Sequence, residues 1–373
     1  MTKSRSGLFT PDNDVVLGRQ ICFFAAFLLP IAKFLEAPSL LAKYAAGDLL
    51  VPAALHFLLQ AGVLTALLFV VSKSEKTLCQ RLEERLGRWA VILYLVYAAY
   101  YLFHAILPLL DLEKYVYAAF FDTAPTTFSF GFFFVLTAFV CSKGLKSVGR
   151  CADLCLFLFV LPFVALLLMT VFQADFTRLL PIFGTKFGDT VYAFNVTTPH
   201  FSDAILLLPL LANYRYKKGD APKILAGYSV GAVCTFLFLA TFYAVYSSIA
   251  PREHYAFSKI AQYFPALSVV GRIDLIFVYL LSVVLFFYTC MPLQYAVDLV
   301  CRLSRTQRRT IFAAALSVGG FIFTLFCNKY YDRFYALFSG KLWFVFWIFA
   351  DAIPLLFLLL LRKKARKKEN ENV

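Results

Sequence analysis

Apolar positions along the chain are grouped into long runs, and polar positions fall between them. Runs of about 20 apolar residues, enough for a helix to cross the core of a bilayer, recur from one end to the other. Ten such runs predict ten transmembrane helices, at 16–42, 48–72, 88–111, 126–142, 151–172, 190–213, 224–249, 273–298, 310–327 and 342–361. We therefore expect an all-α integral membrane protein, with an N-terminal tail (1–14), one transmembrane domain (15–361) and a basic tail (362–373).

The sixth run is apolar at both ends and polar in its middle. Its centre holds Pro199 together with six polar residues: Asn195, Thr197, Thr198, His200, Ser202 and Asp203. Proline lacks an N–H and clashes with the preceding turn, so we expect the helix to break just before Pro199. Freed backbone groups inside a membrane need partners in protein or in a water-filled cavity. A broken helix of this kind is therefore expected to line a binding site.

The first run carries a similar interruption. Pro30 lies near its middle, and Lys33 and Glu36 follow it, one helical turn apart. Five spans separate the first run from the sixth, so the two helices cross the bilayer in opposite directions. Interrupted helices at matching places in two halves indicate an inverted repeat with a binding site near the bilayer midplane. The pattern thus predicts a 5+5 inverted repeat with broken helices 1 and 6.

Two broken helices offer groups that suit a zwitterion such as an amino acid. The N-termini of half-helices present unpaired N–H groups to a carboxylate, and exposed carbonyls with an acidic side chain suit an ammonium group. Asp203 is the predicted ammonium partner; alternatively, it only bonds the broken backbone. The predicted ligand-binding residues are Pro30, Ala32, Lys33, Tyr97, Tyr101, Thr197, Thr198, His200, Asp203 and Ser282.

Several of these residues allow a second interpretation. Lys33 and Glu36 are expected to pair with each other or with the sixth helix, and such a pair is also compatible with a purely structural role. His200 is either a pH sensor or a structural hydrogen-bond donor. Four residues of the third span lie on neighbouring turns, where they line a pocket or only pack: Tyr97, Tyr100, Tyr101 and His104.

Composition and charge fit this picture. Only 16% of the 373 residues are charged, against about 25% in a soluble domain. The net charge is +14, and 24 of the 36 Lys and Arg residues fall in alternate loops and tails, against nine in the loops of the other side. This bias places both termini in the cytoplasm and argues against a nucleic-acid partner. The nine cysteines show no metal-type spacing, so no metal or cofactor is expected.

Four stretches resemble the spore germination permeases. They read FLLPIAKFLEAPSLLAKYAAGDLL, SKGLKSVGRCADLCLFLFVLPF, RLLPIFGTKFGDT and VVGRIDLIFVYLLSVVLFF. These permeases are the B subunits of nutrient germinant receptors and belong to the amino acid–polyamine–organocation superfamily. The resemblance extends from Val15 to Leu361.

The resemblance implies a LeuT-like fold and a multi-pass protein in the spore inner membrane or the bacterial cell membrane. It also implies A and C subunits as partners and a small nutrient, commonly an amino acid, as ligand. Transporters of the superfamily usually break their first span at glycines, whereas this chain reads Leu29-Pro30-Ile31-Ala32-Lys33 there. The ligand contacts of relatives are therefore not carried over to this chain.

Three other functions are weighed against a receptor. A secondary amino acid transporter would use the same site with alternating access, although the fifth span (151–172) holds no Lys and Asp153 as its only acid. A channel-forming or scaffolding subunit is compatible with the buried charges. An enzyme is not expected, because the four histidines are scattered over distant parts of the chain and no nucleophile–base arrangement is evident.

Overall fold

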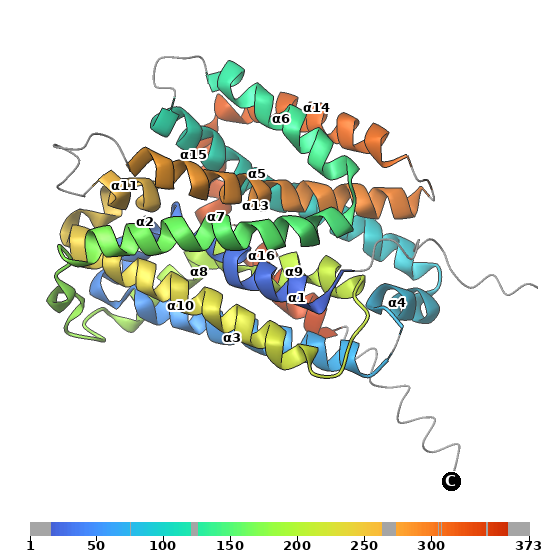
Figure 1. Cartoon of the computed structure of the whole chain (residues 1–373), viewed down its shortest axis with the longest axis horizontal. Helices are drawn as coiled ribbons and strands as arrows, with labels where there is room; N and C mark the ends of the chain where they lie inside the picture. Colours follow the sequence, from blue (N-terminus) through green and yellow to red (C-terminus); the bar gives the residue numbers. More distant parts are fainter. Residues whose placement is uncertain are drawn as a thin grey trace, which may run out of the picture.

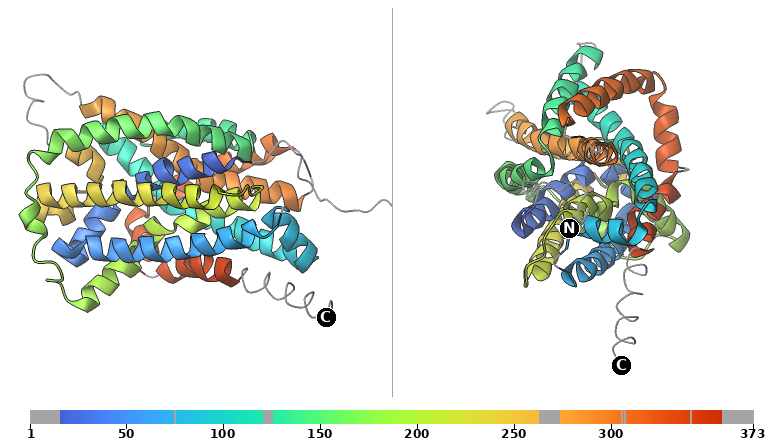
Figure 2. Two further views of the ribbon diagram at one scale, coloured as in Figure 1. Left: turned by 60° about the horizontal axis from the view of Figure 1, so that its bottom comes forward. Right: turned by 90° about the vertical axis from the view of Figure 1, so that its right-hand side faces the viewer.

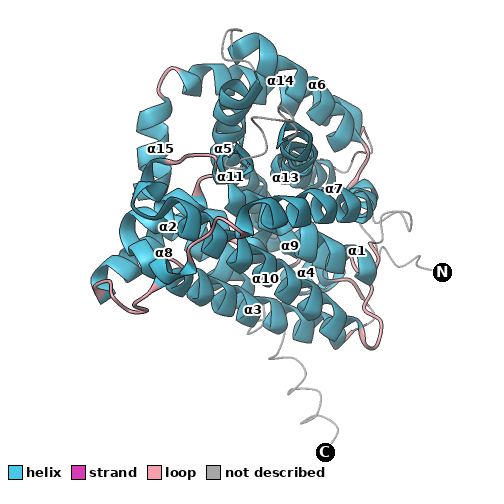
Figure 3. Cartoon of the chain, turned by 60° about the vertical axis from the view of Figure 1, so that its left-hand side comes forward, coloured by secondary structure: helices cyan, strands magenta, loops and turns pink. Residues whose placement is uncertain are grey.

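The computed structural model describes residues 16–74, 76–120, 126–262, 274–304, 306, 308–340 and 342–356. Within these ranges the chain forms helices joined by short loops, with one isolated bridge between Val16 and Tyr214 and no strand (Figure 3). The all-α architecture expected from the sequence is confirmed. The predicted tails 1–14 and 362–373 lie outside the described residues.

The helices follow one another largely as the apolar runs predict. The α-helices are α1 (Gly18–Phe23), α2 (Ala37–Ala45), α3 (Leu50–Ser72), α4 (Leu78–Leu86), α5 (Trp89–Phe120), α6 (Thr126–Ser142), α7 (Leu145–Val171), α8 (Phe187–Phe201), α9 (Asp203–Ala212), α10 (Asp220–Tyr246), α11 (Ala256–Gln262), α13 (Asp274–Leu303), α14 (Arg309–Asn328), α15 (Tyr331–Gly340) and α16 (Trp343–Trp347). The π-helical segments are η2 (Phe24–Leu28) and η7 (Ile348–Ala352), and the 3₁₀ segments are η3 (Leu29–Phe34), η4 (Ala46–Asp48), η5 (Phe176–Leu179) and η6 (Ser247–Arg252).

The long helices run side by side along the long axis of the molecule (Figures 1 and 2). α13 packs on α5 and α7, and α14 packs on α6 at one edge of the bundle (Figure 1). α1 contacts both α7 and α10, while α8 contacts α2, α3 and α16. α4 lies at one end of the bundle and α11 at the other (Figure 1). We call these the α4 end and the α11 end.

Six helices in the described part of the chain are long and apolar enough to cross a membrane: Leu50–Ser72, Trp89–Val116, Leu145–Val171, Asp220–Arg252, Leu275–Leu303 and Arg309–Cys327. The bent pair Gly18–Phe34 and Ala37–Asp48 is a seventh candidate when it is counted as one span. Phe130–Ser142 and Trp343–Leu356 are shorter apolar helices. The chain is therefore a multi-pass membrane protein, and the count of ten spans stays a prediction.

Two glycines allow α10 to approach the first helix closely. A Cβ on Gly227 would lie 2.6 Å from the carbonyl oxygen of Cys22, and a Cβ on Gly231 would lie 2.6 Å from that of Ala25. Real Cβ atoms do not approach backbone this closely, so a larger residue would push the two helices apart. The Pro30 ring also lies beside Gly231. α10 therefore packs closely on the first helix as far as Pro30.

Candidate functional site

The first and sixth spans are both interrupted, as expected, but the interruptions lie after the prolines. Along the first span the chain changes from α to π to 3₁₀ winding, and then breaks at Leu35 and Glu36 with a bend of 62°. The predicted break just before Pro199 is wrong, since α8 continues through Pro199 to Phe201 and the break comes at Ser202.

Side-chain hydrogen bonds explain the position of the break at Ser202. The Ser202 hydroxyl donates to the carbonyl oxygen of Thr198 (2.7 Å), near the C-terminal end of α8. The backbone N–H of Ala204, in the first turn of α9, donates to Gln60 Oε1 on α3 (2.9 Å). Groups that a helix break leaves unpaired in a membrane are thus satisfied by protein at this point. Proline alone removes one N–H, and the helix tolerates that loss at Pro199.

A buried ion pair joins the two broken helices. Lys33 Nζ lies 2.6 Å from Asp203 Oδ1 and also donates to the carbonyl oxygen of Leu29 (3.1 Å). The other carboxylate oxygen of Asp203 accepts a hydrogen bond from the Tyr228 hydroxyl (3.0 Å). Both charged side chains are almost completely buried, with 1% and 3% exposure. The expected pairing of Lys33 with the sixth helix is confirmed, and Asp203 is fully partnered by the protein itself.

The segment that precedes α11 covers the break in the first helix. His254 Nδ1 lies 2.8 Å from Glu36 Oε2, and the backbone N–H of Ala256 donates to the carbonyl oxygen of Leu35 (3.1 Å). The hydrogen bond with Glu36 raises the pKa of His254. Glu36 therefore pairs with the segment before α11 and not with Lys33. The α11 end of the bundle is closed over the break by these contacts.

A small cavity lies where the two breaks meet, and we call it the break cavity. Eleven residues of five predicted spans line it: Ala32, Leu35, His104, Leu107, Pro108, Asp111, Pro199, His200, Leu285, Tyr288 and Phe346. It contains about 360 Å³ of space between atoms, of which about 20 Å³ is open to the centre of a water molecule. A single water needs roughly 10–15 Å³ by that measure. The cavity in this conformation therefore has room for one or two waters.

Polar atoms of the break cavity lack hydrogen-bond partners in the protein. They are both ring nitrogens of His104, Nε2 of His200 and Oδ1 of Asp111. These side chains are only 1%, 7% and 3% exposed. A buried polar group without a partner costs roughly 1–3 kcal/mol, so this concentration of such groups indicates a place that water or a ligand fills. A neutral imidazole offers one donor and one acceptor, and a carboxylate offers acceptors.

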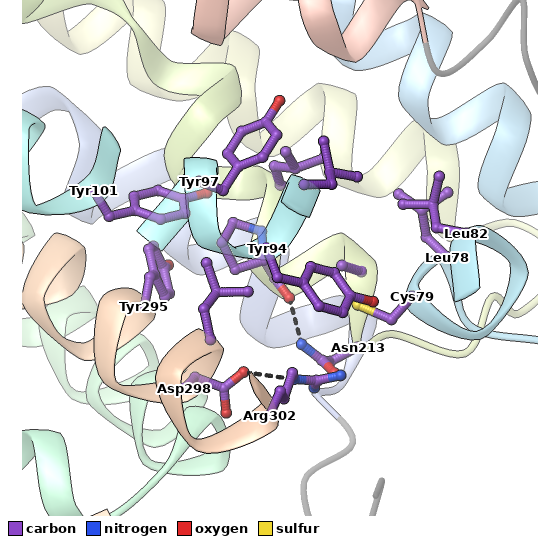
Figure 4. A pocket seen from close by; sticks show the side chains of 15 residues that line it. Leu78, Cys79, Leu82, Tyr94, Tyr97, Tyr101, Asn213, Tyr295, Asp298 and Arg302 are labelled. Carbon is purple, nitrogen blue, oxygen red and sulfur yellow. Dashed lines mark hydrogen bonds and ion pairs between the residues drawn. The ribbon is translucent and has the colours of Figure 1, made fainter. Parts of the chain in front are cut away.

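A second cavity lies toward the α4 end, and we call it the α4-end cavity (Figure 4). It is larger, with about 530 Å³ of space between atoms, and it is mainly apolar. Its charged residues already have partners: Arg302 Nε donates to Asp298 (3.0 Å), and Arg302 also donates to the side chain of Asn213. Because these charges are satisfied, this cavity offers fewer groups to a polar ligand than the break cavity does.

The predicted ligand-binding residues lie in several separate parts of the structure. Ala32 and His200 line the break cavity, whereas Tyr97 and Tyr101 line the α4-end cavity. Lys33 and Asp203 form the buried pair. The others do not line either cavity: Pro30 packs beside α10, Thr197 and Thr198 donate to backbone carbonyls of α8, and Ser282 bonds Tyr115 and the carbonyl oxygen of Val278. Their role in ligand binding stays a prediction.

Pro108 and Asp111 of the third span also line the break cavity, although the sequence pattern did not predict them there. His104, Pro108 and Asp111 line it, and Tyr97 and Tyr101 lie on the same face of α5, one or two turns nearer the α4 end. Spacings of three and four residues place these side chains on one face of a helix. This strip of polar residues and proline was the signal available in the sequence. It would have placed Asp111 in the site beside His104.

Comparison with known proteins decides the family. Residues 53–331 match the family model described as spore germination protein. This chain belongs to the spore germination protein family. The match covers most of the chain, from α3 to the start of α15, and confirms the resemblance noted in the sequence. No curated protein matches the chain. With its apolar helices, the chain is thus a germination-related membrane protein.

Proposed function

We propose that this spore germination protein is the nutrient-sensing subunit of a germinant receptor, and that it binds a small nutrient, an amino acid, in the break cavity. The observation that carries the proposal is the set of unpartnered polar atoms on His104, Asp111 and His200 where two broken helices meet. Ligand sites are concave, mostly apolar and equipped with a few convergent polar groups. The break cavity fits this description.

The proposed architecture is the ten-span, LeuT-like 5+5 inverted repeat. Helices that stand five predicted spans apart pack on one another: α3 on α10, α5 on α13, α6 on α14, and α2 on α8. In an inverted repeat, equivalent helices are related by a pseudo-two-fold axis in the membrane plane, and helices close to that axis meet their own counterparts. These contacts support the repeat, with the break cavity near its centre.

The proposed orientation puts the α4 end in the cytoplasm, together with both termini. The connections between long helices at this end, with the first residues of the helices that follow them (73–88, 143–150 and 215–223), carry 12 of the 36 Lys and Arg residues. Cytoplasmic loops of membrane proteins are enriched in these residues. The protein would lie in the spore inner membrane or the bacterial cell membrane. Its proposed partners are the A and C subunits of the receptor and the lipid bilayer.

In this proposal, ligand acts by favouring one conformation of the bundle. The break cavity is too small for an amino acid as it stands, so binding requires the helices around it to separate. A ligand shifts such an equilibrium only by its difference in affinity for the two states. The unpartnered polar atoms would supply that difference, and the partner subunits would respond to the movement.

The alternative function is a secondary amino acid transporter. One observation favours it: α5 and α13 line both cavities, the break cavity and the α4-end cavity, in succession along their length. Alternating access needs a midplane site with a route to each side. A transporter and a receptor can share this geometry, because fold alone does not determine function.

Uptake measurements separate the two functions. The purified full-length chain is placed in proteoliposomes, and accumulation of radiolabelled amino acids is compared with binding of the same amino acids. A receptor subunit binds amino acid without accumulating it, and a bulky Ala32→Phe change in the cavity wall abolishes the binding. Accumulation that is lost in Ala32→Phe would establish the transporter instead. Binding that is unaffected by Ala32→Phe would contradict both functions at this site.

A further inference from the structure

Asp203, the acid predicted from the sequence to meet the ligand's ammonium group, is already occupied. Its two oxygens accept from Lys33 (2.6 Å) and Tyr228 (3.0 Å), and the Lys33 ammonium group occupies the place that a ligand cation would take. A ligand would have to displace Lys33, which would leave a buried ammonium without its counter-ion. Such a loss costs several kcal/mol. An amino acid therefore needs a different acidic partner.

Asp111 on α5 is the acid that the break cavity offers. It lines the cavity, is 3% exposed, and its Oδ1 has no hydrogen-bond partner. No Lys or Arg is found among the described residues that line this cavity. A cation in this cavity would therefore meet Asp111 without a competing basic side chain in the cavity wall.

We propose that Asp111 binds the ammonium group of the ligand, while His104 and His200 bind its carboxylate. This inference rests on the proposed function and specifies its ligand class as amino acids with small, uncharged, aliphatic side chains. The histidines supply hydrogen-bond donors for the carboxylate. The remaining wall is apolar, from Ala32, Leu35, Leu107 and Leu285, among others, and would surround a short aliphatic side chain.

The test compares ligands that differ only in the ammonium group. The receptor complex, co-expressed and purified with its partner subunits, is titrated with L-alanine and with propionate, which lacks the ammonium group. Wild type should bind L-alanine at least tenfold more tightly than propionate. Asp111→Asn should remove that preference, because one charge-assisted hydrogen bond contributes about 10- to 100-fold in affinity. Glu113→Gln, a buried acid two residues further on that does not line the cavity, should retain it.

The decisive measurement is the ratio of the affinities for L-alanine and propionate. A variant that only loosens the structure would weaken the binding of both ligands alike and leave this ratio unchanged. A preference for L-alanine that survives in Asp111→Asn, or equal binding of the two ligands by wild type, would overturn the assignment of Asp111. If Asp111→Asn does not fold, equal binding of the two ligands by wild type still overturns the assignment. Suppose that Ala32→Phe loses binding but Asp111→Asn keeps the wild-type ratio of affinities for L-alanine and propionate. The cavity would then remain the binding site, and only the role of Asp111 would be rejected. Binding unaffected by Ala32→Phe would reject the proposed site as a whole.

Discussion

At the scale of residues, the Lys33–Asp203 pair decides how the two broken helices meet. Both side chains are buried, and Lys33 Nζ lies 2.6 Å from Asp203 Oδ1. The Tyr228 hydroxyl donates to the other carboxylate oxygen of Asp203. The attraction between buried charges roughly offsets the cost of removing them from water, but removing one partner leaves the other charge uncompensated. The stability of the protein should therefore fall when one charge is removed, and should change little when both charges are removed together.

The first prediction concerns this coupling. Asp203→Asn, which leaves the Lys33 ammonium buried without a counter-ion, should destabilise the protein by about 3–5 kcal/mol. The double variant Lys33→Met/Asp203→Asn should recover most of that stability, since the amide can still accept from Tyr228. Thermal unfolding in detergent measures both variants and the single Lys33→Met control. Losses that simply add in the double variant would show that the two charges do not interact.

The second prediction concerns pH at the α11 end. Hydrogen bonding to Glu36 raises the pKa of His254 above its ordinary value of about 6.5. The contact should therefore stabilise the fold fully below pH of about 6.5, and lose its effect as pH rises through the higher folded pKa. The stability difference between wild type and His254→Gln should decrease from pH 6 to pH 9. Because the His254 side chain is 60% exposed, screening limits the difference to about 1 kcal/mol or less. A difference that grows with pH would contradict this account.

Some residue contacts could be predicted from the sequence, and others could not. Lys33 was expected to find an acid on the sixth helix because a buried charge in a membrane needs a partner. The partner of Glu36 could not be predicted, because His254 belongs to a loop whose path depends on the whole bundle. Asp111 was missed because an acid at the end of an apolar run looks like the edge of the membrane, until the face of α5 on which it lies is considered.

At the scale of elements, close packing between α10 and the first helix depends on glycine. The third prediction is that Gly231→Ala destabilises the protein by about 1–3 kcal/mol, the usual cost of overpacking, because the new Cβ would lie 2.6 Å from the Ala25 carbonyl oxygen. Gly62→Ala on α3 is the matched control, since nothing lies within 4 Å of its added Cβ. Thermal unfolding of the two variants is the measurement. Equal stability would mean that α10 and the first helix are not in close contact.

The interruptions of the helices could be predicted only in part. Proline marked the correct spans, but the breaks at Leu35–Glu36 and at Ser202 lie beyond Pro30 and Pro199. A helix ends where other groups satisfy the backbone that it exposes, and those groups belong to distant elements. At the Ser202 break, the exposed N–H of Ala204 donates to Gln60 of α3. No local sequence pattern reveals this contact.

At the scale of the whole molecule, the fourth prediction tests orientation. With the α4 end in the cytoplasm, an impermeant maleimide added to intact cells should label Arg252→Cys and not Lys217→Cys, and both should react after the membrane is opened. Arg252 is the last residue of η6 and Lys217 lies in the loop before α10, and both are exposed at opposite ends of the bundle. The native cysteines are buried or half-buried, which keeps background labelling low. The reverse labelling pattern would mean that the protein is inserted the other way round.

The Lys33–Asp203 pair also bears on how the protein is made. Its two residues are 170 positions apart in the chain, so the first span leaves the ribosome long before the sixth. Until Asp203 is synthesised, Lys33 adds roughly 2.5–3.5 kcal/mol to the cost of placing the first span in lipid. The insertion machinery must therefore hold that span, or leave it shallow, until the sixth arrives. A chain that ends after the first span should therefore be extracted from membranes by alkaline carbonate, and its Lys33→Leu variant should resist extraction.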